Sequence, residues 1–172
     1  CWRDIRKWKA EWAGLYVIFT RRGTDIKKYP AIKRHLENFR EDLEPKKSES
    51  AKKGRKPGPY KWFEIQDNIA YFEEFKKTKI ISTKISIQPT FSLDFTSSYL
   101  GNTSYFITVD SQDRYLLVAL LNDKLSEYYS RRIFVGKQNG YYEVQPEGLE
   151  AFPIPSASDK QKLPIIERVQ KI

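Results

Sequence analysis

Apolar residues along the chain gather in short runs that have the length and composition of β-strands. Residues 14–20 form a continuous aliphatic, aromatic and β-branched run, so we expect a buried strand there. Further strands of similar length are expected within residues 62–65, 79–86, 90–95 and 104–109. The last three runs follow one another through tight connections and predict a small sheet.

Other segments repeat apolar positions at helical spacing. From Pro30, which suits a first helical turn, apolar residues recur at i, i+4 and i+7 and predict an amphipathic helix that ends at Pro45. A second, shorter helix is expected to begin at Asp67 or Asn68 and to run to Phe75. These helices are interspersed among the strands without a regular βαβ order.

The longest helix is expected over about residues 111–132. Its first half is apolar on nearly every face, which indicates burial, whereas its second half is amphipathic. Another helix is expected to start after Pro155, within residues 156–172. Because strands and helices mix without strict βαβ alternation, the fold class we predict is α+β, a single domain with a small mixed β-sheet packed by helices.

Residues 46–61 differ from the rest of the chain. They contain seven basic side chains and one acidic side chain, a net charge of +6, with little to bury. The Gly and Pro content predicts a loop without helix or strand. A long loop inside a compact domain is often functional, and this one carries the densest positive charge in the chain. A solvated linker is the alternative interpretation.

The composition of the whole chain points the same way. Its 31 Lys and Arg residues against 22 Asp and Glu residues give a net charge of +9, which favours a polyanionic partner, although a well-solvated surface would also carry such charge. The single cysteine, Cys1, excludes an intramolecular disulfide and a multi-cysteine zinc site, which favours the cytoplasm. The chain has no apolar run of membrane-spanning length and no signal-peptide pattern, so no membrane partner is expected.

Residues suited to catalysis are sparse. The only histidine, His35, falls in a charged helical segment, where we expect it to face solvent rather than to serve a nucleophile. Nucleases hold a divalent metal with acidic residues and a lysine, and one such set can be written down here: Glu64, Asp67, Glu74 and Lys76. We expect these side chains to be solvated, and we keep a metal-dependent nuclease fragment as an alternative function.

Cofactor chemistry is also missing from the sequence. The chain has no glycine-rich strand-turn-helix for a nucleotide cofactor. Residues 57–60, Pro-Gly-Pro-Tyr, have a passing likeness to the Asn/Asp-Pro-Pro-aromatic motif of adenine methyltransferases but lack its polar acceptor. We therefore expect no cofactor in this chain and no methyl transfer by it alone.

The order of several short segments resembles a known family, the C-terminal specificity domain of the TaqI-like adenine-specific DNA methyltransferases and of the type IIG restriction-modification enzymes built on them. The segments that carry the resemblance are Trp2-Arg3-Asp4-Ile5, residues 14–20, Trp62-Phe63-Glu64-Ile65, Lys79-Ile80-Ile81, Asn102 to Ile107, Leu120-Leu121-Asn122, Gly140-Tyr141-Tyr142 and Phe152-Pro153-Ile154-Pro155. The family usually has Gly-Arg-Asp-Ile at the first of these. Trp2 stands in place of that glycine, and Cys1 at the first position indicates that the start of the domain is clipped.

The resemblance implies that residues 1–155 are a DNA target-recognition (specificity) domain, truncated at its N-terminus and followed by the start of a C-terminal helix. Most of the motif residues are expected to build the core rather than to contact DNA. In such proteins DNA lies between this domain and a methyltransferase domain of the same polypeptide, with a nuclease domain left open. S-adenosylmethionine, and Mg as an open alternative, would belong to the parent enzyme.

The contacts with double-stranded DNA are expected from two basic segments. Phosphates would be neutralised by Lys52, Lys53, Arg55 and Lys56. Base edges would be read by a second segment, because its side chains match the hydrogen-bonding patterns of guanine and adenine: Arg131, Arg132, Lys137, Gln138 and Asn139. The predicted function is sequence-specific DNA recognition for a restriction-modification or related phage-defence enzyme. A basic protein-interaction module remains a further alternative.

Overall fold

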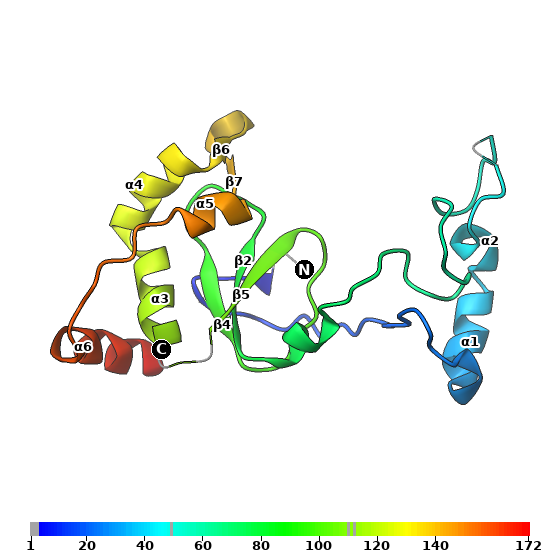
Figure 1. Cartoon of the computed structure of the whole chain (residues 1–172), viewed down its shortest axis with the longest axis horizontal. Helices are drawn as coiled ribbons and strands as arrows, with labels where there is room; N and C mark the ends of the chain where they lie inside the picture. The colour runs from blue at the N-terminus through cyan, green and yellow to red at the C-terminus, as the bar shows by residue number, and fades with distance from the viewer. Residues whose placement is uncertain (1–3, 49, 110, 112) are drawn as a thin grey trace. The chain divides into compact units, whose positions relative to one another are not determined.

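The chain divides into two compact units (Figure 1). The computed structural model describes residues 4–48, 50–109, 111 and 113–172. The larger unit comprises residues 1–15 and 72–172, and the smaller unit comprises residues 16–71. Cys1, Trp2 and Arg3 lie outside the described residues, as do Asp110 and Gln112 at the start of the helix expected over residues 111–132. Helices accompany a mixed sheet, so the predicted α+β class is confirmed.

The main sheet of the larger unit has the strand order β1-β4-β2-β5. Its strands are β1 (Trp8–Lys9), β2 (Lys79–Thr83), β4 (Phe91–Asp94) and β5 (Ser104–Thr108). Strand β2 pairs antiparallel with both β4 and β5, whereas β1 pairs parallel with β4, which makes the sheet mixed. Every residue of β2 is buried, because the strand is central and covered on both faces. The strands expected within residues 79–109 are thereby confirmed.

A second, antiparallel sheet has the strand order β3-β7-β6. It consists of β3 (Ile85–Ser86), β6 (Val135–Gly136) and β7 (Tyr142–Glu143). In its register Glu143 is the partner of both Ile85 and Val135, so these three side chains share one face. Tyr142 and Ser86 point the other way and are buried.

Two helices, rather than one, occupy most of residues 111–132. Helix α3 (Asp113–Asn122) is the buried half and α4 (Lys124–Ile133) is the amphipathic half. Asp123 lies between them with an extended backbone, and its carboxylate accepts a hydrogen bond from the Leu125 amide at 2.7 Å. The prediction of a single long helix was therefore wrong at this point, because Asp123 caps a new helix instead of continuing the old one.

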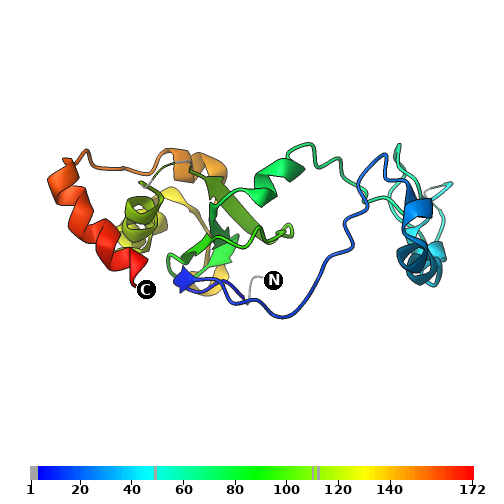
Figure 2. The same cartoon turned by 90° about the horizontal axis from the view of Figure 1, so that it is seen from below.

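The chain ends in helix α6 (Asp159–Gln170), after the short helix α5 (Pro146–Glu150). Ser158 and Gln161 form a reciprocal capping box at the start of α6, and Pro164 is accommodated inside the helix. Helix α6 lies beside α3 in both Figure 1 and Figure 2. The helix expected after Pro155 is thus present and packs on the larger unit.

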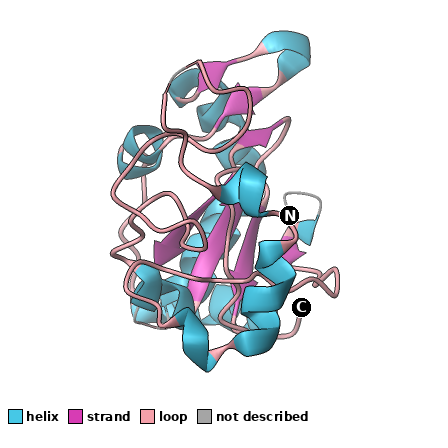
Figure 3. Cartoon of the chain, turned by 90° about the vertical axis from the view of Figure 1, so that its right-hand side faces the viewer, coloured by secondary structure: helices cyan, strands magenta, loops and turns pink. Residues whose placement is uncertain are grey.

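The hydrophobic core of the larger unit lies between the main sheet and the helices, which are coloured by type in Figure 3. The rings of Phe134 and Tyr142 are stacked with their centroids 5.6 Å apart. Gly148 in α5 allows this packing, because a Cβ atom there would lie 2.7 Å from the Phe134 ring. The buried cluster comprises Ile80, Phe91, Val118, Leu121, Phe134, Tyr142, Val144 and Phe152.

Two buried polar arrangements join the elements of this core. The Asn122 carboxamide accepts a hydrogen bond from the Phe91 amide at 3.0 Å and donates one to the Phe91 carbonyl at 2.8 Å, as a neighbouring strand would. Lys79 and Asp94 form an ion pair of 2.7 Å whose side chains have essentially no exposed area. Lys79 also donates to the Phe75 carbonyl at 2.8 Å, so its buried charge is satisfied.

The smaller unit contains short helices: η2 (Ile26–Lys28, a 3₁₀ helix), α1 (Pro30–Glu37) and α2 (Arg40–Leu43). The helix predicted from Pro30 is present but is interrupted at Asn38 and Phe39. Glu64 is buried and accepts hydrogen bonds from the amides of Lys61 and Gly23, which ties two turns of this unit together.

Three predicted elements are wrong. The apolar run at residues 14–20 pairs with none of the described strands, and most of it is exposed, with Tyr16 at 88%. Residues 62–65 form a turn rather than a strand, because Glu64 bonds to backbone amides instead of a ladder. The helix expected from Asp67 or Asn68 is confined to the 3₁₀ helix η3 (Phe72–Lys76). Apolar composition alone did not determine these segments, because each needed a partner that the fold does not supply.

Candidate nucleic-acid interface

The residues predicted to contact DNA fall into two groups, one in each unit. Lys52, Lys53, Arg55 and Lys56 lie together in the smaller unit, in a segment that has no helix and no strand, as its composition predicted. The segment Arg131 to Asn139 lies in the larger unit, from the end of α4 through β6 to the following turn.

The base of the basic loop is held by Arg55. Its backbone exchanges hydrogen bonds with Glu44 and Lys46 at 3.0 and 2.9 Å. Its guanidinium donates to the carbonyls of Leu43 at 2.7 Å and Trp62 at 2.9 Å and lies 4.7 Å from the centre of the Tyr60 ring. With its donors directed at the protein, Arg55 is suited to fixing the loop rather than to neutralising a phosphate.

Gly54 makes this closure sterically possible. Its φ of +100° is in the region that favours glycine, and a Cβ atom there would lie 2.6 Å from the Glu44 carbonyl oxygen. The sequence shows Gly54 only as part of a Gly- and Pro-containing loop. Its role depends on the approach of residue 44, which the local pattern does not reveal.

The three lysines of the loop are less constrained than Arg55. Lys53 forms an exposed ion pair with Glu41 at 3.0 Å, and the hydrogen bond from Lys53 to Glu41, with added attraction from Asp42, raises the pKa of Lys53. Lys52 and Lys56 are exposed and have no ion pair among the described residues. These two ammonium groups are available to an anion without first breaking a contact.

Trp62 follows the loop and is half-buried. The Arg40 guanidinium lies 4.8 Å from the centre of its indole ring, and the Phe63 ring meets it edge-on. Together with the hydrogen bond from Arg55 to the Trp62 carbonyl, these contacts join the end of the loop to α2. The ring is thus engaged by protein groups.

The second group surrounds the outer face of the β3-β7-β6 sheet. Arg131 donates to Glu127 at 3.2 Å and to the Ile87 carbonyl at 3.1 Å. Arg132 lies over the Tyr128 ring at 3.5 Å and donates to the Tyr128 carbonyl. Both arginines predicted as base readers are therefore engaged within the larger unit.

Glu143 neutralises the lysines of this face. Its carboxylate pairs with Lys137 at 2.7 Å and with Lys84 at 3.3 Å. The hydrogen bond from Lys137 is the main cause that lowers the pKa of Glu143, and the bond to Glu143 raises the pKa of Lys84. Sequence reasoning missed Lys84 and Glu143, because only the strand register brings them beside Lys137.

The polar side chains at the tip of this sheet are exposed. Gln138, Asn139 and Gly140 form a short 3₁₀ turn between β6 and β7. Asn139 has a φ of +58° and Gly140 a φ of +75°, conformations that Asn and Gly tolerate better than other residues. A surface hollow of about 520 Å³ adjoins the turn and is lined by Ile85, Lys137, Gln138 and Tyr141.

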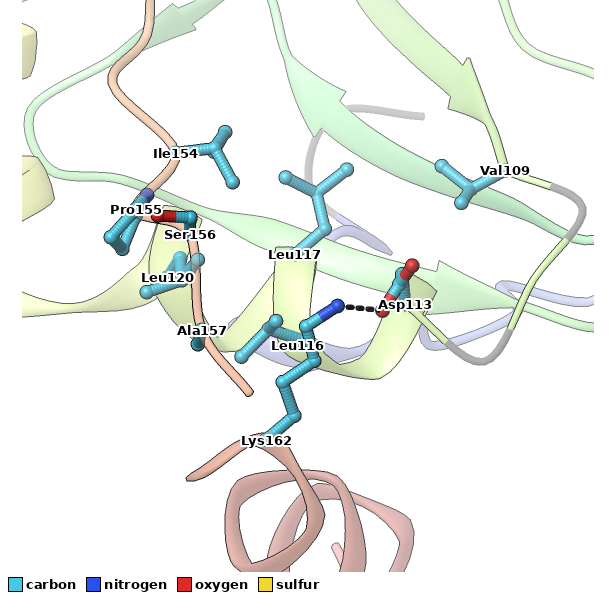
Figure 4. A pocket seen from close by; sticks show the side chains of 10 residues that line it. All are labelled: Val109, Asp113, Leu116, Leu117, Leu120, Ile154, Pro155, Ser156, Ala157 and Lys162. Atoms are coloured by element: carbon cyan, nitrogen blue, oxygen red, sulfur yellow. Dashed lines mark hydrogen bonds and ion pairs between the residues drawn. The ribbon is translucent and has the colours of Figure 1, made fainter. Parts of the chain in front are cut away.

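A second hollow, of about 360 Å³, lies between α3, residues 154–157 and α6 (Figure 4). Its walls are mainly aliphatic, from Leu116, Leu117 and Leu120 of α3 among others. An ion pair between Lys162 and Asp113 at 3.2 Å crosses one side of it. This chemistry does not match a phosphate or a base edge, so the hollow is not part of the candidate interface.

The acidic residues considered for a metal are not assembled into a site. Glu74 pairs with Lys77 at 2.9 Å and Lys76 pairs with Glu73 at 2.7 Å, both on the surface. Across the part of the chain that the structure describes, no group of three His, Cys, Asp or Glu side chains could hold a metal ion. His35 is exposed and lies 5.4 Å from the Phe39 ring. Within the same described ranges, no helix is long and apolar enough to cross a membrane.

Comparison with known protein families identifies the family of this chain. The family model of the TaqI-like C-terminal specificity domain matches residues 3–154. A search of curated proteins finds no match. The matched range includes the whole main sheet, α3, α4 and both candidate contact groups.

Proposed function

Because the chain belongs to the TaqI-like C-terminal specificity domain family, we propose that it recognises the sequence of duplex DNA for catalytic domains elsewhere in its polypeptide. The match over residues 3–154 is the observation that carries the proposal. A specificity domain is not itself catalytic, so the chemistry belongs to the parent enzyme.

The parent is proposed to be an adenine-specific DNA methyltransferase or a type IIG restriction-modification enzyme that acts in the cytoplasm against phage DNA. Its methyltransferase domain would bind S-adenosylmethionine, and a nuclease domain, where the parent has one, would use Mg. The specificity domain would then position the target base for these domains.

Phosphate contacts are assigned to the basic loop of the smaller unit. Lys52 and Lys56 are exposed and unpaired among the described residues, and Lys53 can exchange its exposed partner Glu41 for a phosphate. Such contacts supply affinity and fix the register of the protein on DNA, but they carry no sequence information. Arg55 is removed from this set, because its guanidinium serves two carbonyl groups of the protein.

Base reading is assigned to the turn after β6 and the sheet face beside it. Gln138 and Asn139 present exposed carboxamides at the turn of the β6-β7 hairpin, which is one edge of the β3-β7-β6 sheet, and the major groove of B-DNA is wide enough to admit a two-stranded β-ribbon such as this hairpin. The backbone of the ribbon is fixed by the pairing of Val135 with Glu143 and of Gly136 with Tyr142.

The proposal is tested by titrating the chain into a random-sequence duplex at two salt concentrations and by selecting the duplexes that bind. We expect binding that weakens as salt rises and enrichment of one short sequence. Binding without enrichment would overturn sequence recognition, and the absence of DNA binding would favour the protein-interaction alternative. Cleavage of DNA by the chain alone with Mg present would favour the nuclease alternative.

Calorimetry with S-adenosylmethionine provides a separate test of whether cofactor binding belongs to another domain of the parent enzyme. We expect no uptake of the cofactor by this chain, because the sequence lacks both a cofactor loop and an adenine pocket. Stoichiometric binding would show that part of the catalytic machinery lies here.

A further inference from the structure

The outer face of the β3-β7-β6 sheet is aliphatic on both sides of a neutralised carboxylate. Ile85 and Val135 flank Glu143 in the strand register and are 43% and 46% exposed. Tyr141 continues this face and is 42% exposed. The face thus offers apolar surface to a partner at the place where the sheet ends in a polar turn.

The charged groups near this face are already satisfied. Glu143 forms ion pairs with Lys137 and Lys84. Arg131 donates hydrogen bonds to Glu127 and to the Ile87 carbonyl. Arg132 lies over the ring of Tyr128. Guanine is read in the major groove chiefly by a free Arg or Lys, and cytosine by a free carboxylate. Each of the named cations, and the Glu143 carboxylate, already has a partner within the part of the chain that the structure describes.

The carboxamide of Gln138 is different. It lines the hollow together with Ile85, and among the described residues its side chain has no hydrogen-bond partner. A carboxamide presents one donor and one acceptor side by side, which matches N7 and the N6 amino group of adenine. An aliphatic side chain next to it matches the C5 methyl group of thymine, which lies on the same edge of the base pair.

We propose that this surface recognises an A·T base pair in the major groove, with Gln138 bonded to adenine and Ile85 against the thymine methyl group. The proposal rests on the proposed function and makes it specific. Asn139 shapes the turn through its positive φ, and Lys137 stays paired with Glu143 beside the base pair. The specificity of this position comes from shape and hydrogen bonding rather than from charge.

The test uses the unaltered chain and a duplex selected from the random pool. Each adenine is replaced in turn by 7-deazaadenine, and each thymine by uracil. At one A·T pair we expect the lost N7 acceptor to weaken binding about tenfold. At the same pair we expect the lost methyl group to weaken binding about threefold to fourfold. A selected site in which no A·T pair responds to both replacements overturns the proposal.

Variants then connect that base pair to the named residues. Gln138→Ala should abolish the response to 7-deazaadenine at that pair, and Gln138→Glu should move the preference there from adenine toward cytosine. Ile85→Ala should abolish the response to uracil. Asn68→Ala removes an exposed carboxamide of the smaller unit and should leave both responses intact.

The outcomes separate this inference from the proposed function. If the chain selects a sequence but Gln138→Ala keeps the full response to 7-deazaadenine, the A·T assignment is wrong while DNA recognition stands. If the chain selects no sequence, DNA recognition fails and this assignment fails with it.

Discussion

The two basic regions of this chain hold their cations in opposite ways. In the loop of the smaller unit, Lys52 and Lys56 are exposed and unpaired among the described residues. On the sheet face of the larger unit, Lys137 and Lys84 share Glu143, and Arg131 is bound to Glu127. The sequence makes the two regions look alike, since both are rich in Lys and Arg.

Under the proposed function, this difference would assign affinity to the loop and specificity to the sheet face. Unpaired lysines attract any phosphate backbone, whatever the base sequence. Paired cations add little net field, so in the proposed account neutral groups such as Gln138 and Ile85 would determine which base pair the sheet face accepts. Both roles require a main sheet that is firmly supported and a loop whose base is fixed by Arg55.

The largest effect is expected from Asp94, the last residue of β4 in the main sheet. Asp94→Ala leaves the buried ammonium group of Lys79 without its counter-charge, which should lower the free energy of unfolding by about 3–5 kcal/mol. Denaturant unfolding of the larger unit measures it. Asp113→Ala breaks the more exposed pair with Lys162 and should cost less than about 1 kcal/mol. Equal losses in the two variants would show that the buried pair gives no special support.

The Asp94 carboxylate also makes the stability of the larger unit depend on pH. Burial by itself raises the pKa of Asp94, but hydrogen bonds from Lys79 and Thr96 outweigh it and leave the pKa below its usual 3.8. The stabilisation is therefore fully present above pH 3.8 and is lost as the pH falls through the lowered value. Unfolding measured from neutral pH down to this range should show the loss in the native chain, and a smaller loss in Asp94→Asn. Parallel pH profiles would contradict the assignment.

A smaller effect is expected at the base of the loop. Arg55→Ala removes charge-assisted hydrogen bonds to the Leu43 and Trp62 carbonyls and should destabilise the smaller unit by about 1.5–3 kcal/mol. Protease cleavage between residues 46 and 61 should become faster. Lys52→Ala changes a neighbouring exposed charge and should leave both properties unchanged. Faster cleavage in both variants would mean that loop charge, rather than the Arg55 anchor, protects the segment.

The sequence predicted well the elements that have a clear apolar spacing. The β2, β4 and β5 strands and the helices from Pro30 and after Pro155 follow from apolar spacing. The break at Asp123 had a visible signal, since an Asp before Lys124 and Leu125 is a favourable helix cap, but the apolar run of α3 obscured it. Helices and strands that are determined by residues close to them in the sequence can be predicted from the sequence.

The remainder depends on contacts distant in sequence. From the sequence, a lysine in a strand is expected to be solvated. The β2–β4 register instead places Lys79 beside Asp94, with which it forms a buried ion pair. In the sequence Arg55 cannot be distinguished from the other cations of the loop. In the structure its guanidinium donates hydrogen bonds to the Leu43 and Trp62 carbonyls. The candidate site was predictable as two basic segments, but which of its charges are free was not.

The most direct test of the account is the salt dependence of DNA binding in two sets of variants. Replacing Lys52 and Lys56 by Ala should reduce the log-log salt slope by about 1.8 and weaken selected and random duplexes alike. Gln138→Ala should leave the slope unchanged and weaken only the selected duplex. A matched double variant of Lys160 and Lys171 to Ala, both in or next to α6, should change neither property. An unchanged slope without Lys52 and Lys56, or equal weakening of both duplexes by Gln138→Ala, would contradict the division between a phosphate-binding loop and a base-reading sheet.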